Sequence, residues 1–291
     1  MQFRKATDNV SIAGEKSTTT GITCAIEFIV FRELQAAGRE NRAARLDSEG
    51  LKVELLGFLL GGSETTASVA SWLVKYIAAN KQAQQKLRHE LEVTFDVAKS
   101  EGRSPTVTEM MNSFSAGHSM AYMHAVVEET LRCAAIIFGV ARMAKQATSI
   151  LGYHVPEGAN IMNLFCGPGI QEPSLNVKEE NRSGKKVFTN WTRGSEAHFI
   201  PERWLKVSTD AGGKHLEIFD PRAGPTIPFG AGSRTCFGKR LAYLQLRMFA
   251  VLLVWNFELL DTVSVNDNSA TTKATRIPNA CHVNLRRVER G

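Results

Sequence analysis

The sequence has no long apolar run. Its longest unbroken apolar stretch extends from Met248 to Trp255, whereas roughly 18 to 20 such residues are needed to cross a bilayer. Residues 1–30 also have no apolar segment that ends at a small-residue cleavage site, as a secretory signal would. We therefore expect no transmembrane segment in this chain, no signal peptide, and an intracellular location.

Cysteine is scarce, and its spacing excludes two classes of protein. The chain has five cysteines, an odd number, at positions 24, 133, 166, 236 and 281. These positions are too far apart for a C-x-x-C zinc site, and they do not form the framework of a disulfide-rich domain. We expect reduced thiols.

Charge of one sign is also limited. The sequence has 35 basic and 29 acidic residues, a formal net charge of +6, and the excess is spread along the chain. No cluster of Lys and Arg with interleaved aromatic residues is present, so a solvated basic surface is favoured over a nucleic-acid site. We expect no nucleic-acid partner.

Helical periodicity dominates what is present. Of the 291 residues, 43% are hydrophobic, enough for a sizeable core. Short β-type runs with glycine and proline turns fill residues 136–162, and residues 167–198 have the composition of a long surface segment. The fold class we predict is α-rich α+β, with helices at residues 51–79, 81–96, 120–133 and 239–259.

A glycine-punctuated loop precedes the last of these helices and contains Cys236. The start of a helix favours a thiolate, because backbone amides and the helix dipole stabilise the anion. A thiolate in this position is a good axial ligand for haem iron. The alternatives are a buried structural cysteine, which a neighbouring arginine in a glycine-rich loop disfavours, and a nucleophile, for which no histidine has a recognisable partner pattern.

The spacing of five residues in this loop resembles the F-x-x-G-x-R-x-C-x-G signature of the cytochrome P450 haem-thiolate monooxygenases; they are Phe229, Gly232, Arg234, Cys236 and Gly238. The resemblance implies haem b with Cys236 as the axial ligand. It also implies that Arg234 contacts a haem propionate. Arg142, which follows a later motif, is a weaker candidate for the same contact.

Residues 61–66, Gly-Gly-Ser-Glu-Thr-Thr, resemble the motif of the long helix that crosses the distal face of the haem in this family. The resemblance implies a kinked turn at the glycine pair. It also implies that Thr65 hydrogen-bonds the oxygen being reduced and that Glu64 relays protons. By itself the motif is equally compatible with an ordinary helical Glu-Thr-Thr beside a flexible glycine pair.

Two further motifs occur in the order of the family. Glu129 and Arg132 match E-x-x-R, whose two side chains share one face of a helix; alone, such a pair is as often a weak surface ion pair. Residues 199–204, Phe-Ile-Pro-Glu-Arg-Trp, resemble the F-x-P-E-R-[F/W] segment. The resemblance implies that Arg203 joins Glu129 and Arg132 in a buried cluster with a structural role.

The resemblance extends from about residue 51 to about residue 260, which corresponds to the C-terminal part of a family member. We therefore expect residues 1–50 to form a loose segment with a partial helix, and residues 51–291 to form the C-terminal haem-binding part of a truncated P450 domain. The long insert and the Pro-Glu-Arg-Trp variant resemble fungal-type members. Full-length relatives often have a membrane anchor at the endoplasmic reticulum, in a portion that precedes this match.

The resemblance implies a monooxygenase that inserts one oxygen atom from O₂ into an organic substrate, lipophilic or of secondary metabolism. Electrons would come from an NADPH-dependent flavoprotein reductase, for which a basic surface is suited. Ile136, Ile137 and Phe138 are candidates for the pocket wall, or equally for plain core. The alternatives are an inactive remnant with weak or no haem binding, and a haem-thiolate isomerase or dehydratase that needs no reductase.

Overall fold

The computed structural model describes residues 24–115, 120–165, 194–209, 212–213, 215–224, 226–261 and 264–290. The chain forms two compact units, residues 1–63 and residues 64–291. Most of the predicted long surface segment lies outside the described residues, as does the polar start of the chain. The boundary that we expect near residue 50 stays a prediction.

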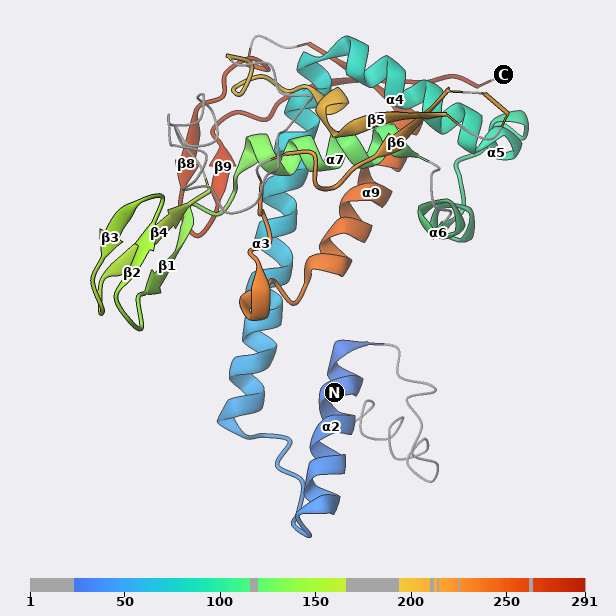
Figure 1. Cartoon of the computed structure of the whole chain (residues 1–291). Helices are drawn as coiled ribbons and strands as arrows, with labels where there is room; N and C mark the ends of the chain where they lie inside the picture. The colour runs from blue at the N-terminus through green and yellow to red at the C-terminus, as the bar shows by residue number, and fades with distance from the viewer. Residues whose placement is uncertain are drawn as a thin grey trace. The chain divides into compact units, whose positions relative to one another are not determined.

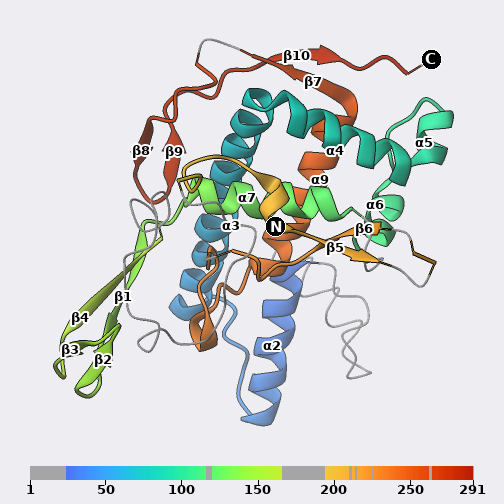
Figure 2. The same ribbon diagram turned by 45° about the horizontal axis from the view of Figure 1, so that its top comes forward.

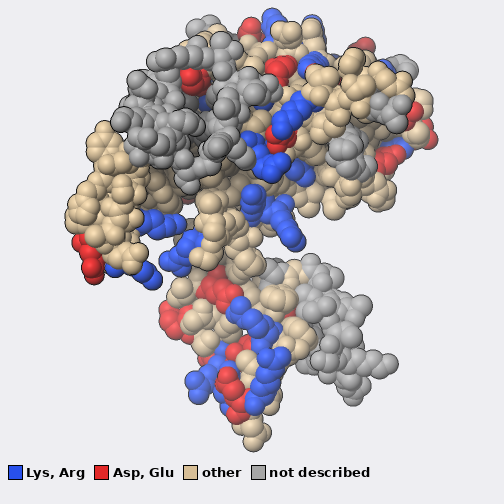
Figure 3. Space-filling view, in the orientation of Figure 1, with Lys and Arg blue, Asp and Glu red and all other residues tan. Residues whose placement is uncertain are grey.

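The first unit is built on helix α2 (Ala25–Arg39) and on the start of helix α3 (Glu49–Ala79). Val30 is its buried centre, and four partly buried apolar side chains pack around it, those of Ile26, Phe31, Leu34 and Leu46. Figure 3 shows basic and acidic side chains interleaved over this unit, as the Arg42–Glu33 ion pair of 2.6 Å illustrates.

Helix α3 is longer than the apolar pattern predicts by two residues and runs without a break through Gly61 and Gly62. A Cβ added at either glycine would meet nothing within 4 Å. Close packing in the described part of the chain is therefore not the reason for glycine at these positions. In the described ranges, no helix has both the length and the apolar character that a bilayer crossing requires.

The second unit has a helical core, seen in Figures 1 and 2, in which α7 packs against α4 and α9. The core forms because the helices bury one apolar face each, and α7 is buried along nearly its whole length. The helices of this unit after α3 are α4 (Lys81–Thr94), α5 (Asp96–Ser100), α6 (Val107–Ser115), α7 (Ala121–Ala134) and α9 (Lys239–Asn256).

Strands in the described ranges form five antiparallel pairs rather than one small sheet. The pairs β1–β4 and β2–β3 form the ribbon that Figure 1 shows beside α7, and they fill the region where short β-type runs were predicted. The pairs are β1 (Gly139–Met143) with β4 (Asn160–Leu164), β2 (Thr148–Ile150) with β3 (Tyr153–Val155), β5 (Leu205–Thr209) with β6 (His215–Phe219), β7 (Phe257–Leu260) with β10 (Asn284–Arg287), and β8 (Ala270–Thr272) with β9 (Arg276–Pro278).

The predicted end of the last helix is wrong by three residues. Helix α9 ends at Asn256, and the chain continues directly as β7. The reason is tertiary: the buried Gln84 side chain accepts from the Leu259 amide at 2.8 Å and donates to the Leu259 carbonyl at 3.0 Å. These bonds give the backbone N–H and C=O of Leu259 the hydrogen-bond partners that other residues of the same helix would otherwise provide.

Candidate functional site

The cysteine loop lies immediately before α9, as the sequence predicts. The Cys236 amide donates to the Phe229 carbonyl at 2.8 Å, which closes the loop. Gly230 and Gly232 have φ angles of +70° and +69°, a conformation that glycine adopts at little cost. The result is an exposed, free Cys236 thiol three residues before the first residue of α9.

The glycines of the loop are explained by its turns. Gly238 is the N-cap of α9, and a Cβ there would lie 3.9 Å from the Cys236 Sγ, an ordinary van der Waals distance. The loop amides bond to loop carbonyls, such as Gly230 N to Ile227 O at 2.8 Å.

Phe229 connects the loop to the helical core. Its ring packs against that of Tyr243 on α9, with 5.0 Å between ring centroids. The Tyr243 hydroxyl in turn donates to the Glu128 carboxylate of α7 at 2.6 Å. Burial raises the pKa of both groups above their ordinary values. This buried pair therefore fixes the start of the loop against two helices.

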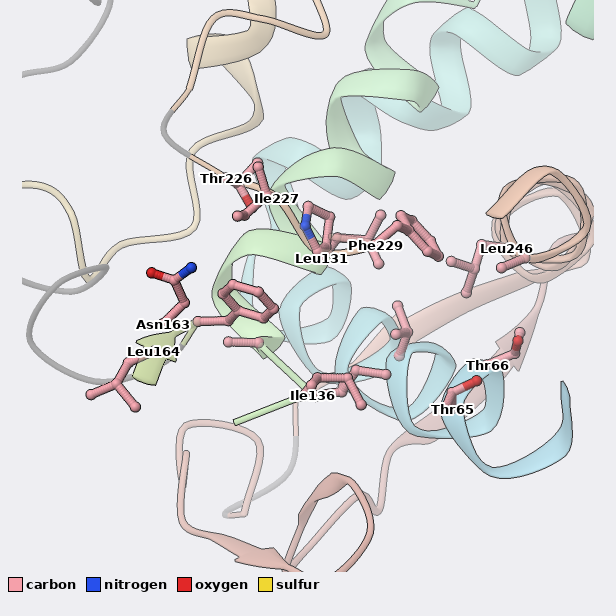
Figure 4. Close-up of a pocket in the computed structure, with 16 residues that line it drawn as sticks. Thr65, Thr66, Leu131, Ile136, Asn163, Leu164, Thr226, Ile227, Phe229 and Leu246 are labelled. Atoms are coloured by element: carbon pink, nitrogen blue, oxygen red, sulfur yellow. The ribbon is translucent and has the colours of Figure 1, made fainter. Parts of the chain in front are cut away.

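A cavity of about 250 Å³ lies between the loop and α3 (Figure 4). Its walls are mostly apolar and come from α3, α7, the segment after α7, β4, the loop and α9; they include Thr65, Leu131, Ile136, Asn163, Phe229 and Leu246. Residues far apart in sequence thus enclose one small space, and Phe229 of the predicted loop and Thr65 of the predicted distal motif both face it.

The three candidates for the pocket wall separate in the structure. Ile136 and Ile137 line the cavity, whereas Phe138 is absent from its wall and is half exposed. The residues that follow α7 therefore supply two apolar side chains to the cavity, and the third side chain points elsewhere.

Glu64 and Thr65 are neighbours on α3 with different surroundings. Thr65 lines the cavity. The Glu64 carboxylate is not part of the cavity wall, and it accepts a hydrogen bond of 2.9 Å from the hydroxyl of Thr275. Thr66, next along the helix, lies 3.5 Å from the amide oxygen of Gln245 on α9.

Glu129, Arg132 and Arg203 come together in the interior. Two guanidinium nitrogens of Arg132 donate to the Glu129 carboxylate, each at 2.8 Å, and the Arg203 Nε lies 3.4 Å from the same carboxylate. All three residues are at most 2% exposed. Burial lowers the pKa of Arg132, but the hydrogen bond to Glu129 and the nearby negative groups together outweigh burial and hold that pKa above its usual value.

This cluster ties α7 to the segment that carries the Pro-Glu-Arg-Trp motif. Arg132 also donates to the carbonyls of Glu196 and His198, at 2.7 and 2.9 Å, and Arg203 donates to the Ser195 hydroxyl at 2.8 Å. Every charged group in it therefore has several partners, which a buried ion pair requires.

Arg142 and Arg234 are not brought to the cavity. Arg142 lies exposed on β1, and its guanidinium donates to the Ala141 carbonyl at 2.8 Å. Arg234 is exposed in η3 (Gly232–Arg234), the turn before Cys236. Neither lines the cavity, so their contacts with a propionate remain predictions.

The structure distinguishes Cys236 from Cys133, which lies beside the buried cluster. Burial, and then the charge of Glu129, raise the pKa of the Cys133 thiol above its ordinary value, which disfavours a thiolate there. Cys236, by contrast, is exposed. Among the described residues, no group of three or more His, Cys, Asp or Glu side chains converges as a metal site.

Sequence reasoning missed three contributors to this region. Trp204 donates its indole N–H to Glu129 at 2.9 Å; its place in the Pro-Glu-Arg-Trp motif is a signal that could have found it. Gln245 and Thr275 contact the α3 motif from 179 and 211 residues away in the chain. No local pattern marks either residue.

Comparison with known proteins decides the family. The family model described as Cytochrome P450 matches residues 3–167 and 197–284, which include every motif of the site. This chain belongs to the cytochrome P450 family. Haem held by a cysteine thiolate is the cofactor of this family.

Two curated fungal relatives show how much of a P450 the chain covers. It is 36% identical to "Cytochrome P450 monooxygenase TRI13" of Fusarium sporotrichioides, over 99% of this chain and 50% of that protein. It is 31% identical to "Hps1-dma1 cluster cytochrome P450 monooxygenase cyp3.1" of Dothistroma septosporum, over 90% of this chain and 86% of that protein. The chain thus spans about half the length of the Fusarium relative.

A solved structure has the same fold. The crystal structure of a cytochrome P450, CYP102L1, matches 98% of this chain and 55% of its own chain, with a TM-score of 0.65 and 19% identity. The α-rich α+β class is therefore confirmed, as the corresponding part of a P450 fold.

The residues of the site fit the cofactor of the family. The cavity offers apolar walls, and the cysteine loop, whose Phe229 lines one of them, leads to the exposed free thiol of Cys236, which is not itself on the cavity wall. Cys236 would hold the iron, and Phe229, on the same loop and on the cavity wall, would pack beside it.

Proposed function

We propose that this P450 is a haem-thiolate monooxygenase that inserts one oxygen atom from O₂ into an organic substrate. The observation that carries the proposal is one cavity with Thr65 of α3 on one wall and Phe229 of the cysteine loop on another. Bound haem would supply the activation of O₂. An NADPH-dependent flavoprotein reductase would supply the electrons, and the basic excess of the chain favours an acidic donor surface.

The substrate class follows from the cavity walls. They consist largely of Leu, Ile, Val, Phe and Ala side chains, which favour lipophilic molecules over charged ones. A role in secondary metabolism is in keeping with the gene cluster in the name of the Dothistroma relative. We place the substrate against Ile136 and Ile137.

The residues of the site have separate roles in the proposed reaction. Cys236 would hold the haem iron, Arg234 and more weakly Arg142 would pair with the haem propionates, and Gly232 and Gly238 shape the loop. The Thr65 hydroxyl holds a proton at the cavity wall. When Thr65 gives up this proton, Glu64, one residue away, supplies another.

The buried cluster has a separate, structural part in this proposal. Glu129, Arg132 and Arg203 hold the proximal side of the haem-binding part, which we assign to residues 51–291, with residues 1–50 as a loose segment before it. All three residues are at most 2% exposed and bond to one another and to the segment before the Pro-Glu-Arg-Trp motif, so we expect their loss to affect folding and haem retention rather than the chemistry.

The decisive experiment is a CO difference spectrum of the reduced chain reconstituted with haem. Wild type should show the Soret band of thiolate ligation, and Cys236→Ala should lose it, because Cys236 is the thiol of the loop that leads into α9. Cys24→Ala, which removes another exposed free cysteine, is the matched control and should keep the band.

Three results would contradict the proposal. A thiolate band that survives in Cys236→Ala would remove the ligand assignment. A wild-type chain without the band would mean that it is an inactive remnant. Turnover of substrate without any reductase would instead indicate a haem-thiolate isomerase or dehydratase.

A further inference from the structure

One face of the C-terminal half of α3 is hydrogen-bonded to a single C-terminal segment, residues 264–281. The four side chains involved are spaced four, four and three residues apart, which places them on one side of a helix. They are Glu64, Ser68, Trp72 and Lys75. The segment contains the hairpin β8–β9, so the position of this hairpin is set by α3.

Lys75 fixes the base of the hairpin. It is 1% exposed, and its ammonium donates to the carbonyls of Ser264, Asp267 and Ala280 at 3.0, 2.6 and 2.7 Å. An ammonium has three protons, so all of them are used. Because these carbonyls lie on both sides of the hairpin, this buried charge holds both of its ends.

Trp72 fixes the residue next to Thr275. Its indole N–H donates to the Arg276 carbonyl at 3.0 Å, and the Arg276 guanidinium lies 4.4 Å from the centre of the indole ring. Arg276 also donates to the Ala134 carbonyl at the end of α7, at 2.8 Å. Thr275 therefore has little freedom to move away from α3.

Thr275 sits at the centre of a small hydroxyl network and is 2% exposed. Its hydroxyl donates to the Glu64 carboxylate at 2.9 Å and lies 2.8 Å from the Ser68 hydroxyl. The Ser68 hydroxyl also donates to the Glu64 backbone carbonyl at 2.8 Å. Two hydroxyls thus link the side chain of Glu64 to its own backbone.

This network can satisfy Glu64 in both protonation states, because a hydroxyl can both donate and accept. With Glu64 ionised, Thr275 donates to the carboxylate. With Glu64 protonated, its carboxyl donates to the Thr275 hydroxyl. The Thr275 hydroxyl then donates to the Ser68 hydroxyl, which donates to the backbone carbonyl of Glu64. The carboxyl can gain and lose a proton without a change of position.

We propose that Thr275 is a positioning residue for Glu64, and that its hydroxyl holds the carboxyl in place on α3 beside Thr65 while the proton is exchanged. The proposal rests on the proposed function of Glu64 as the proton source for Thr65. When proton delivery from Glu64 is slowed, one NADPH, one proton and one O₂ give NADP⁺ and hydrogen peroxide instead of oxidised product.

The first test needs neither haem nor turnover. Urea unfolding of the whole chain is measured for Glu64→Ala, Thr275→Val and the double variant. A hydrogen bond to a carboxylate predicts that the two substitutions are not additive, with a coupling of about tenfold in the unfolding equilibrium constant. Additive effects would overturn the proposal, because the bond would then not exist in solution.

The second test measures hydrogen peroxide released per NADPH consumed by the haem-loaded chain with a reductase. Thr275→Val should raise this ratio several-fold, and Thr275→Ser should restore it because the hydroxyl returns. Thr272→Val, at an exposed threonine of the same hairpin, is the matched control and should leave it unchanged. A purely structural Thr275 would lower haem content or stability without moving the ratio.

The results separate this inference from the proposed function. If wild type oxidises its substrate and Thr275→Val has the same peroxide ratio at equal haem content, only the role of Thr275 is overturned. If wild type has no thiolate–CO band, the proposed function fails, and the catalytic part of this inference fails with it. If Thr275→Val does not fold, Thr275→Ser and Thr275→Ala decide by the same ratio.

Discussion

At the scale of single residues, Glu129 makes more contacts than its motif predicts. The sequence pairs it with Arg132 and, through the family resemblance, with Arg203. In the structure its carboxylate also accepts from the Trp204 indole and from the Ile200 amide, both at 2.9 Å. One fully buried carboxylate therefore joins α7 to the turn that carries the Pro-Glu-Arg-Trp motif and to the residue just before that turn.

We predict that Glu129→Gln lowers the free energy of unfolding by about 3 to 5 kcal/mol, because it leaves two buried guanidinium groups without a charged partner. Urea unfolding followed by far-ultraviolet circular dichroism measures this. Glu202→Gln, at an exposed carboxylate of the same motif, should change stability by less than about 0.5 kcal/mol. Equal effects of the two substitutions would contradict a buried cluster.

Cys236 and Thr275 mark the two extremes of what a sequence reveals about a residue. Cys236 is recognisable because its loop needs glycine at two positive φ angles and leads into an apolar helix, and both properties are local. Thr275 is one of many threonines in a polar stretch. Its significance depends on Glu64, 211 residues earlier, and no local property encodes that contact.

At the scale of elements, the start of α7 depends on another helix. Met120, which precedes α7, has a left-handed backbone with φ of +61° and provides no side-chain cap. The Glu90 carboxylate of α4 instead accepts from the amides of Tyr122 and Met123, each at 2.8 Å. Periodicity predicts α7 to within one residue, but its cap comes from tertiary structure.

This buried cap makes stability depend on pH. Burial raises the pKa of Glu90 to about 7, so the folded state binds the proton more tightly than the unfolded state. The free energy of unfolding that Glu90 contributes therefore falls as pH rises from about 4.5 to about 7, by at most about 3 kcal/mol. Glu90→Gln should remove this loss, so its stability relative to wild type should rise over that interval.

His124 on α7 provides a control of opposite sign. Burial, with the charge of Arg247 second, lowers the pKa of His124 to about 4, so its contribution is present above about pH 6.5 and is lost as pH falls towards 4. His124→Phe should therefore lose stability relative to wild type as pH rises. Urea unfolding between pH 4.5 and 8 measures the free energy of unfolding of both variants. If this free energy changes with pH in the same way for Glu90→Gln and wild type, the assignment of Glu90 as the cap is refuted.

At the scale of the whole molecule, the first unit leaves apolar surface uncovered along α3. Several large apolar side chains there are more than half exposed, namely those of Val53, Leu56, Leu59 and Leu60. Contiguous exposed apolar surface favours association with other molecules. The second unit, by contrast, buries the matching side chains of the same helix, such as Val69, Leu73 and Ile77.

We predict that Leu59→Gln with Leu60→Gln reduces self-association of the chain, because it removes two side chains that are 67% and 60% exposed. Static light scattering over a range of concentrations measures the effect. The free energy of unfolding should change little, since neither side chain is buried. Val207→Gln, at an exposed strand position 72% accessible, is the matched control, and equal association of the two variants would contradict the prediction.

The sequence by itself determined where most of the helices lie, the glycine turns of the cysteine loop and, through its motifs, the family. All of these depend on residues within a few positions of one another, where helical spacing and glycine conformation act. Only the tertiary structure decided the cavity, the cap of α7, the end of α9 and the Thr275–Glu64 contact. Buried polar groups take whatever partner the packing brings near, and packing joins segments that are far apart in the chain.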